Sequence, residues 1–258
     1  MSRIYDNLFF ASSVLLSLYY IRTNSFRQQS TTVVTDGFPK EDCEKCKKSM
    51  AGTVKHYDQH VIFVDSTDNV WSSSVENDQS SLVFHLEKCL SSLKGQYPKV
   101  KIKVTACKKH ELRGKIIIYP EGLVIKVDDI SINMDAIAKF LLTGDKSILE
   151  SSRITVEKPS WKHLLLVCCH QNRDERCGKA GPEIIQTMQT YLDSLSGKDD
   201  VMILPSSHIG GHEYAGTLIV YPKGEWYGQV DKSNAAAVLD SILRGESFLN
   251  CLRGAPKW

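Results

Sequence analysis

The stretch HLLLV, His163–Val167, decides the fold class because an earlier stretch of the chain repeats its pattern. HVIFV, His60–Val64, likewise has one polar residue followed by four apolar residues. Short apolar runs rich in Val, Ile and Leu are typical of strands that are buried on both faces of a sheet. The two stretches lie about a hundred residues apart, which is the length of a small domain.

Two further pairs of segments share that offset. KIIIYPEG at 115–122 corresponds to TLIVYPKG at 217–224, and HELRG at 110–114 corresponds to HEYAG at 212–216. Self-similarity at one fixed offset is the signature of a repeated structural unit. The sequence therefore predicts an internal duplication.

Both repeats have the same predicted order of elements, which is clearest in the second. The predicted elements there are, in order, a strand at 164–167, a helix that begins near Gly181 and Pro182, a strand at 201–204, strands at 217–221 and 226–230, and a helix at 234–243. This order is typical of a thioredoxin-like domain in which a long loop replaces the central helix. We predict an α/β fold with two tandem thioredoxin-like domains, at 36–155 and 156–258.

The composition excludes several classes of protein. With 258 residues and a hydrophobic content of 42%, the chain is long enough for two domains that each bury a core. The formal net charge is +2 and the charges are interspersed, so no broad basic surface for nucleic acid is expected. Eight irregularly spaced cysteines indicate reduced thiols or metal ligands instead of a disulfide framework.

The N-terminal segment, residues 1–35, has the composition of a mitochondrial presequence. Leu8–Ile21 is an apolar run of fourteen residues, shorter than the roughly twenty that span a bilayer as a helix. It is flanked by Arg3, Arg22 and Arg27. We therefore predict a mitochondrial protein without a stable membrane span in its mature form. The alternatives are a membrane anchor, a secretory signal or a native apolar helix, with the cytosol as the second choice of location.

Cysteines and histidines are concentrated in two polar segments of the second repeat, CCHQNRDERCG and HIGGHEYAG. Each segment follows one of two neighbouring predicted strands. Loops that leave the same ends of neighbouring strands lie close together, so we expect their side chains to converge. The candidate ligands are Cys168, Cys169, Cys177, His208 and His212.

Two thiolates and two imidazoles suit either a tetrahedral zinc ion or a 2Fe-2S cluster. Zinc sites usually pair cysteines two to four residues apart, whereas Cys168 and Cys177 are nine apart, and this spacing favours the cluster. Cys169 is the alternative to Cys168, although side chains alternate at a strand end. The first repeat has Ala106 where the second has His208 and no cysteine in its first loop, so we predict that it binds no metal.

Together the two segments resemble the sucrase/ferredoxin-like family of thioredoxin-like ferredoxins. Fungal members of that family, which include a mitochondrial group, carry C-x-H-x-x-R-D-x-x-C-G and H-x-G-G-H-x-x-A-G. Every fixed position of both motifs is matched, and the resemblance covers nearly all of residues 40–258. It implies a 2Fe-2S cluster with two cysteine and two histidine ligands, which correspond here to Cys168, Cys177, His208 and His212.

Such a site predicts a one-electron carrier. Neutral imidazoles in place of two thiolates raise the reduction potential above that of an all-cysteine ferredoxin. A ligating histidine has a second nitrogen that can gain a proton, so the potential is expected to fall as pH rises. Expected partners are electron donor and acceptor proteins of unknown identity and the iron–sulphur assembly machinery. Arg173 and Asp174 are expected to form an ion pair that braces the cysteine segment.

A different function is suggested by Cys43 and Cys46, which form a C-x-x-C pair. That spacing is typical of a redox dithiol or of half a zinc site. The alternatives to an electron carrier are therefore a thiol–disulfide quality-control factor that acts through this pair and a structural zinc-binding module. Cys89 and Cys251 are predicted to lie in the core. Whether the protein catalyses a reaction is left open by the sequence.

Overall fold

The computed structural model describes residues 50–65, 70–97, 99–126, 130–195 and 200–258. The chain divides into two units, Met1–Lys48 and Ser49–Trp258, and all the described residues belong to the second. The predicted presequence at 1–35 and the pair Cys43 and Cys46 lie outside the described residues.

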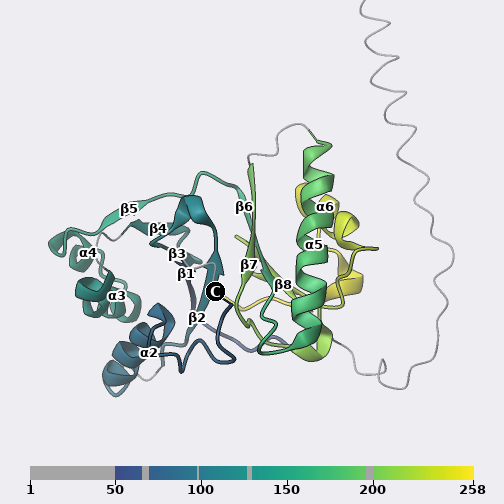
Figure 1. Cartoon of the computed structure of the whole chain (residues 1–258). Helices are drawn as coiled ribbons and strands as arrows, with labels where there is room; N and C mark the ends of the chain where they lie inside the picture. Colours follow the sequence, from purple (N-terminus) through teal and green to yellow (C-terminus); the bar gives the residue numbers. More distant parts are fainter. Residues whose placement is uncertain (1–49, 66–69, 98, 127–129, 196–199) are drawn as a thin grey trace, which may run out of the picture. The chain divides into compact units, whose positions relative to one another are not determined.

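The described residues have a mixed α/β fold (Figure 1). The strands are β1 (Gln59–Asp65), β2 (Ile102–Lys108), β3 (Lys115–Tyr119), β4 (Leu123–Lys126), β5 (Thr155–Glu157), β6 (His163–Cys168), β7 (Val201–Ser206), β8 (Leu218–Tyr221), β9 (Glu225–Tyr227) and β10 (Leu252–Gly254). The α-helices are α2 (Leu82–Leu93), α3 (Ile130–Thr143), α4 (Ser147–Ser151), α5 (Glu175–Asp193) and α6 (Ala235–Leu243). Short 3-10 helices are η2 (His110–Leu112), η4 (His212–Tyr214) and η5 (Leu249–Cys251).

In the described part of the chain, ten strands form one sheet in the order β10-β9-β8-β6-β7-β2-β1-β3-β4-β5. The two halves of this sheet have matching arrangements. In each half the first two strands are parallel and the third is antiparallel to the first. The halves meet where β2 and β7 run antiparallel and Cys107 pairs with Ser206. Both halves follow the predicted order of strand, helix, strand, loop, two strands and helix.

The two half-sheets pack against each other through one shared core (Figure 1). Ile62 of β1 and Leu164 of β6 are both wholly buried in it. His60 is buried as well, and one of its ring nitrogens forms a hydrogen bond with the hydroxyl of Tyr221 in β8. Apolar contacts and a buried polar contact therefore both join the halves.

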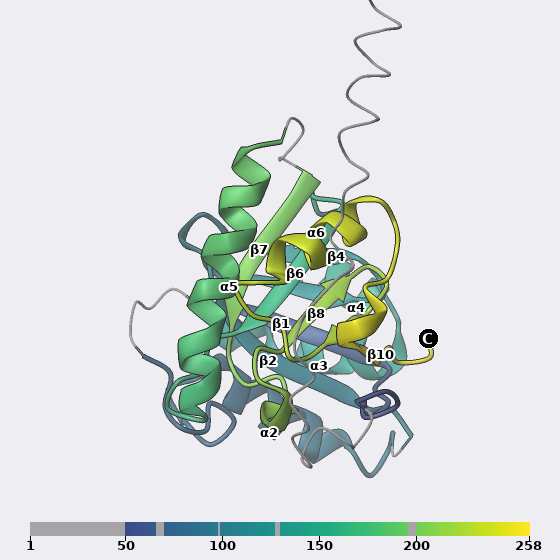
Figure 2. The same cartoon turned by 90° about the vertical axis from the view of Figure 1, so that its right-hand side faces the viewer.

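The opposite face of each half-sheet is covered by helices. Because side chains alternate along a strand, Val61 and Phe63 of β1 face the core beneath α2 and α3. Leu165 and Val167 of β6 face the core beneath α5 and α6 in the same way. Figure 2 shows α5 and α6 lying over the strands of the second half. The unit Ser49–Trp258 therefore has four layers: helices, half-sheet, half-sheet and helices (Figure 1).

The helix predicted to begin near Gly181 and Pro182 begins earlier, at Glu175. The reason is a side-chain cap, because the carboxylate of Asp174 accepts a hydrogen bond from the backbone N–H of Arg176. The proline therefore lies inside α5 instead of in its first turn. This correction moves the last cysteine of the cysteine segment from a loop into a helix.

Two predicted strand ends are also wrong. β7 continues through Pro205 to Ser206 instead of stopping at Leu204, because Ser206 pairs with a strand on each side. β9 ends at Tyr227, before its predicted end, because Gln229 has a φ of 54° and leaves the extended conformation. The short strands β5 and β10 were not predicted.

Gly181 should tolerate no side chain. A Cβ atom at this position would collide with the backbone oxygen of Cys168 and with Sγ of Cys169. We expect Gly181→Ala to lower the free energy of unfolding by about 1–3 kcal/mol, because a backbone oxygen cannot move aside as a flexible side chain can. Gly95→Ala is the control, since its Cβ would meet no atom within 4 Å, and it should change stability by less than about 0.5 kcal/mol. Chemical denaturation measures both, and equal stabilities would contradict the expected collision.

Candidate functional site

The two predicted cysteine ligands lie where β6 ends and α5 begins. Cys168 is the last residue of β6, Cys177 lies in the first turn of α5, and both are wholly buried. The Asp174 cap fixes the start of the helix beside the end of the strand. A hydrogen bond with Cys177 lowers the pKa of Cys168, and the same contact raises the pKa of Cys177. The pair therefore favours one thiolate and one thiol.

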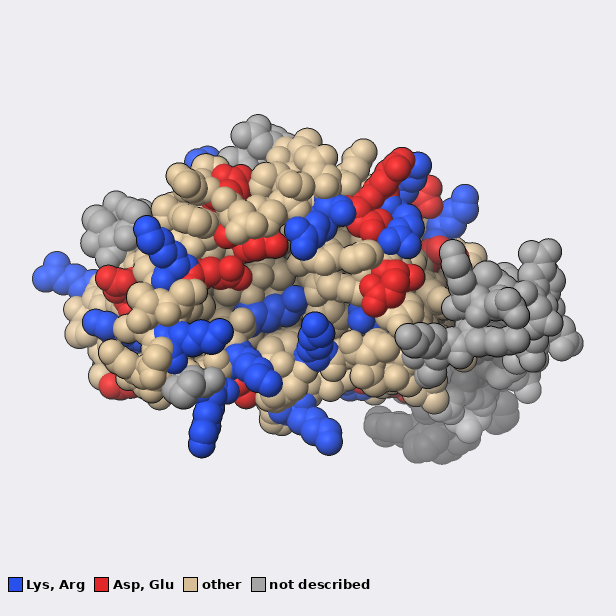
Figure 3. Space-filling model, turned by 90° about the horizontal axis from the view of Figure 1, so that it is seen from below, with Lys and Arg blue, Asp and Glu red and all other residues tan. Residues whose placement is uncertain are grey.

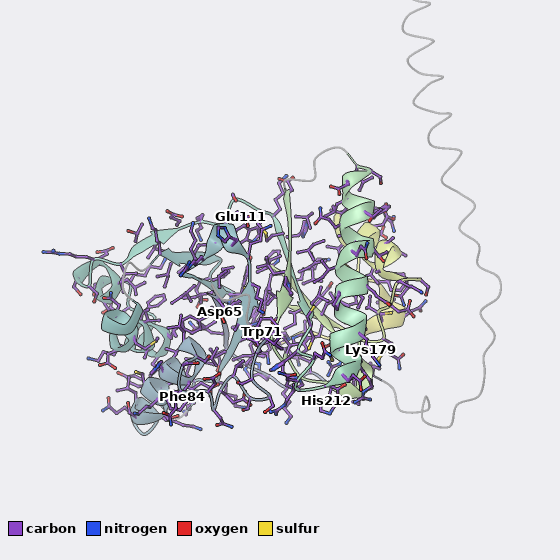
Figure 4. The ribbon with its side chains drawn as sticks, viewed as in Figure 1. Asp65, Trp71, Phe84, Glu111, Lys179 and His212 are labelled. Atoms are coloured by element: carbon purple, nitrogen blue, oxygen red, sulfur yellow. The ribbon has the colours of Figure 1, made fainter. Side chains whose placement is uncertain are left out.

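The two predicted histidine ligands lie side by side after β7. The ring centroids of His208 and His212 are 5.5 Å apart. His208 is half-buried, whereas His212, the first residue of η4, is exposed at the end of the molecule where α5 begins (Figure 4). Gly211 between them has a φ of 76°, and a Cβ atom there would collide with the guanidinium of Arg253. The loop therefore requires glycine at this position.

The structure thus arranges the four predicted ligands as a thiol pair and an imidazole pair. His208 links the pairs, because a hydrogen bond from it also contributes to the lowered pKa of Cys168. Nδ1 of His208 is buried and has no hydrogen-bond partner in the described part of the chain. Among the described residues, no three His, Cys, Asp or Glu side chains lie close enough together to hold one metal ion.

Cys169 lies on the other side of the strand end. Its side chain packs against the two cores beneath the helices, whereas Cys168 belongs to the core between the half-sheets. Burial raises the pKa of Cys169 to about 12. Its position, on the face of the strand opposite to Cys168, keeps Cys169 away from the thiol pair.

His170 connects the two ligand segments, a role that sequence reasoning missed. Its ring is buried, and Nε2 donates to the carbonyl oxygen of Ser72 at 2.7 Å. Nδ1 accepts from the backbone N–H of His208 at 3.0 Å. Burial lowers the pKa of His170, in agreement with a neutral ring that donates at one nitrogen and accepts at the other. Its fixed position in the C-x-H motif was the available signal.

The expected ion pair between Arg173 and Asp174 is wrong. Arg173 instead pairs with Glu76 at 3.6 Å and donates to the carbonyl oxygen of Ser73 at 3.2 Å, both in the first half. Asp174 pairs with Arg176 at 2.8 Å while it caps α5. The cysteine segment is therefore braced by a loop about a hundred residues earlier in the chain, not by its own charges.

The remaining predictions concern the other cysteines and the membrane. Cys251 is buried beneath α6, which confirms its core prediction. Cys89 is only half-buried and packs against the edge of the core of the first half, so its prediction is confirmed in part. The C-terminal Trp258 is 44% exposed, and its ring centroid lies 5.4 Å from that of Tyr57. Within the described ranges, no helix has the length and apolar character needed to cross a membrane.

Comparisons with known proteins confirm the family resemblance. The model of the sucrase/ferredoxin-like family matches residues 50–254. Altered inheritance of mitochondria protein 32 from Debaryomyces hansenii is 28% identical over 205 residues, or 69% of this chain and 74% of that protein. The protein of the same name from Clavispora lusitaniae is 34% identical over 110 residues. That match covers 41% of this chain and 40% of the relative. The solved structure of a thioredoxin-like 2Fe-2S ferredoxin from Aquifex aeolicus superposes on this chain with a TM-score of 0.35 and 18% sequence identity. The match covers 38% of this chain and 96% of the ferredoxin chain.

The Asp174 cap can be tested by two substitutions. We expect Asp174→Ala to lower the free energy of unfolding by about 1 kcal/mol, and Asp174→Asn to lower it much less, because asparagine also caps helices. Arg176 lowers the pKa of Asp174 from 3.8 to about 2. A pKa lowered by folding stabilises the protein above the unfolded value and loses that effect as pH falls, so the small gap between wild type and Asp174→Asn should close between about pH 4 and pH 2. Urea denaturation across that range measures the gap, and a gap that widens towards low pH would contradict this interpretation.

Proposed function

Because the chain belongs to the sucrase/ferredoxin-like family, we propose that it holds a 2Fe-2S cluster and carries single electrons. The proposed ligands are Cys168, Cys177, His208 and His212. The observation that supports this most directly is their arrangement in pairs, two adjacent thiols and two adjacent imidazoles. A cluster that has two cysteines on one iron and two histidines on the other requires such pairs.

Two of these groups, Cys168 and His208, already present donors that suit a metal centre, whereas Cys177 would lose its proton when metal binds. Metal ligands must present a thiolate or a neutral imidazole nitrogen. The lowered pKa of Cys168 supplies a thiolate, and the buried Nδ1 of His208 supplies a nitrogen that no described group occupies. A buried polar atom without a partner is costly unless something else binds it. A single zinc ion, the alternative, would need all four donors at roughly 2.0–2.3 Å from one point.

When bound, a cluster of this kind supplies one-electron transfer at a potential above that of all-cysteine ferredoxins. The chain itself buries the thiol pair and leaves His212 exposed. Electron donors and acceptors are therefore expected to approach the imidazole side. The ring nitrogens of His208 and His212 that do not bind metal would hold the proton that accompanies the electron.

We further propose a mitochondrial protein made by duplication. The names of the relatives and the composition of residues 1–35 support the location. The matching strand orders of the two halves support the duplication, with domains at 36–155 and 156–258 and no cluster in the first. The proposed partners are donor and acceptor proteins and the iron–sulphur assembly machinery.

The ligand assignment predicts the metal content of single variants. We expect purified protein to hold about two irons and two acid-labile sulphides per chain, and each of Cys177→Ser, His208→Ala and His212→Ala to lose most of both. Cys169→Ser and His110→Ala are the controls and should keep the cluster. His110 is the exposed counterpart of His212 in the first half. Iron and sulphide analysis with visible absorption measures this, and one zinc per chain without acid-labile sulphide would refute the proposal.

The imidazole ligands predict a pH-dependent reduction potential. Uptake of one proton with one electron lowers the potential by about 59 mV for each unit that pH rises. Redox titration of the wild-type protein between about pH 6 and pH 9 should show a slope of this sign in the range where the ring nitrogen titrates. His110→Ala should keep the slope. A potential that is constant across the range would mean that no ligand takes up a proton on reduction.

A further inference from the structure

A cavity lies behind the loop that carries His208 and His212. Its volume is about 380 Å³. The lining includes the backbone of Gly210 and Gly211, the ring of Trp226, and segment 53–57, which precedes β1. Figure 3 shows the molecule from the end at which His212 lies, and Lys and Arg side chains are spread over this face between acidic ones. The cavity is separate from the proposed ligand atoms but shares their loop.

Two cationic side chains from opposite halves reach this cavity. Lys103 of β2, in the first half, donates from Nζ to the carbonyl oxygen of Ile209 at 2.7 Å. Arg253 of β10, in the second half, donates to the carbonyl oxygen of Gly210 at 3.4 Å and to Oγ1 of Thr53 at 3.1 Å. These bonds fix the positions of both cations and leave protons on each that they do not use.

Both cations lie within cation–π distance of the same aromatic ring, that of Trp226. Lys103 Nζ lies 5.2 Å and Arg253 Cζ 5.4 Å from the ring centroid of Trp226. The two positive charges repel each other, and the charge of Arg253 lowers the stability of the charged form of Lys103. Burial is the main cause that lowers the pKa of Lys103 to about 8; Arg253 acts in the same direction, whereas the thiolate of Cys168 opposes the shift. Burial also lowers the pKa of Arg253, which is only 3% exposed.

No carboxylate neutralises either cation within ion-pair distance among the residues that the structure describes. Glu213, on the rim of the cavity, acts on Arg253 only from farther away. The thiolate of Cys168, Glu87 and Glu76 likewise act on Lys103 from outside ion-pair distance, with Cys168 the strongest of the three. Carbonyl oxygens and a ring face offer partial negative charge but no formal charge. Buried charges in proteins are normally paired, and no described anion pairs directly with either of these two cations.

From this geometry we propose that the cavity binds a small organic anion. Its carboxylate or phosphate oxygens would lie between Lys103 and Arg253, and its flat or apolar body would lie against Trp226. A guanidinium and an ammonium held at fixed positions recognise oxyanions, and an aromatic wall favours a flat partner. The site is distinct from the proposed cluster, because none of its residues is a proposed ligand, although Lys103 and Arg253 bind the loop between the two histidines.

The two cations of the site form hydrogen bonds with the loop that carries His208 and His212. The carbonyl oxygens that Lys103 and Arg253 bind belong to Ile209 and Gly210, between the two histidines. An anion that draws either cation away would release a bond that holds this loop. The site is therefore placed to act as an effector or substrate site beside the imidazole pair.

Isothermal titration calorimetry of the full-length protein, at constant ionic strength, tests the proposal. The probes are inorganic phosphate, phenyl phosphate and benzoate, with benzyl alcohol as the neutral match. We expect saturable binding of at least one anion and none of benzyl alcohol. Phenyl phosphate against benzoate distinguishes phosphate from carboxylate recognition, and phenyl phosphate against inorganic phosphate measures the contribution of the aromatic wall.

The variants separate this cavity from general surface charge. Lys103→Met and Arg253→Gln should each weaken binding about ten-fold or more, whereas Lys101→Met, which removes an exposed charge near the start of β2, should not. Lys103→Arg keeps the positive charge and should keep much of the affinity. Its comparison with Lys103→Met tests the site even if Arg253→Gln fails to fold. No saturable binding of any anion, or equal affinity in Lys103→Met and Lys101→Met, would overturn the proposal. Iron content measured on the same samples keeps this result distinct from failure of the cluster.

Discussion

The buried ring of His170 is the contact on which the site depends. It accepts from the backbone N–H of His208 and donates to the carbonyl oxygen of Ser72, so that one neutral imidazole joins the cysteine segment, the histidine loop and the first half. A buried ring that is satisfied at both nitrogens has one tautomer and one orientation. The thiol pair and the imidazole pair are therefore held at a fixed separation by a residue that belongs to neither.

This contact explains why a half without candidate ligands accompanies the half that has them. The loop of the first half that contains Ser72 receives His170, and Glu76 from the same region pairs with Arg173. On the other side Lys103 holds the histidine loop from β2. Without the first half, both segments that carry the candidate ligands would lose these partners. The first half thus acts as the outer support of the site.

How much could be predicted from the sequence follows from the range of each interaction. Strands β1 and β6 were predicted because a short apolar run is a local signal. The start of α5 was missed because a single carboxylate, Asp174, capped the chain ahead of the proline signal. The partner of Arg173 was missed because it lies about a hundred residues away. The strands β5 and β10 have three residues each, too few to show a period.

The difference in burial across the site determines where charge can enter or leave. Cys168 and Cys177 have no exposed surface, so the dielectric around the thiol pair is low and a net change of charge there is unfavourable. His212 is exposed, and water can stabilise a charge on its ring. In the proposed electron carrier, a proton that compensates for an added electron would therefore be taken up on the imidazole side. The glycines of the histidine loop make this possible, because the positive φ of Gly211 lets the chain turn between a half-buried imidazole and an exposed one.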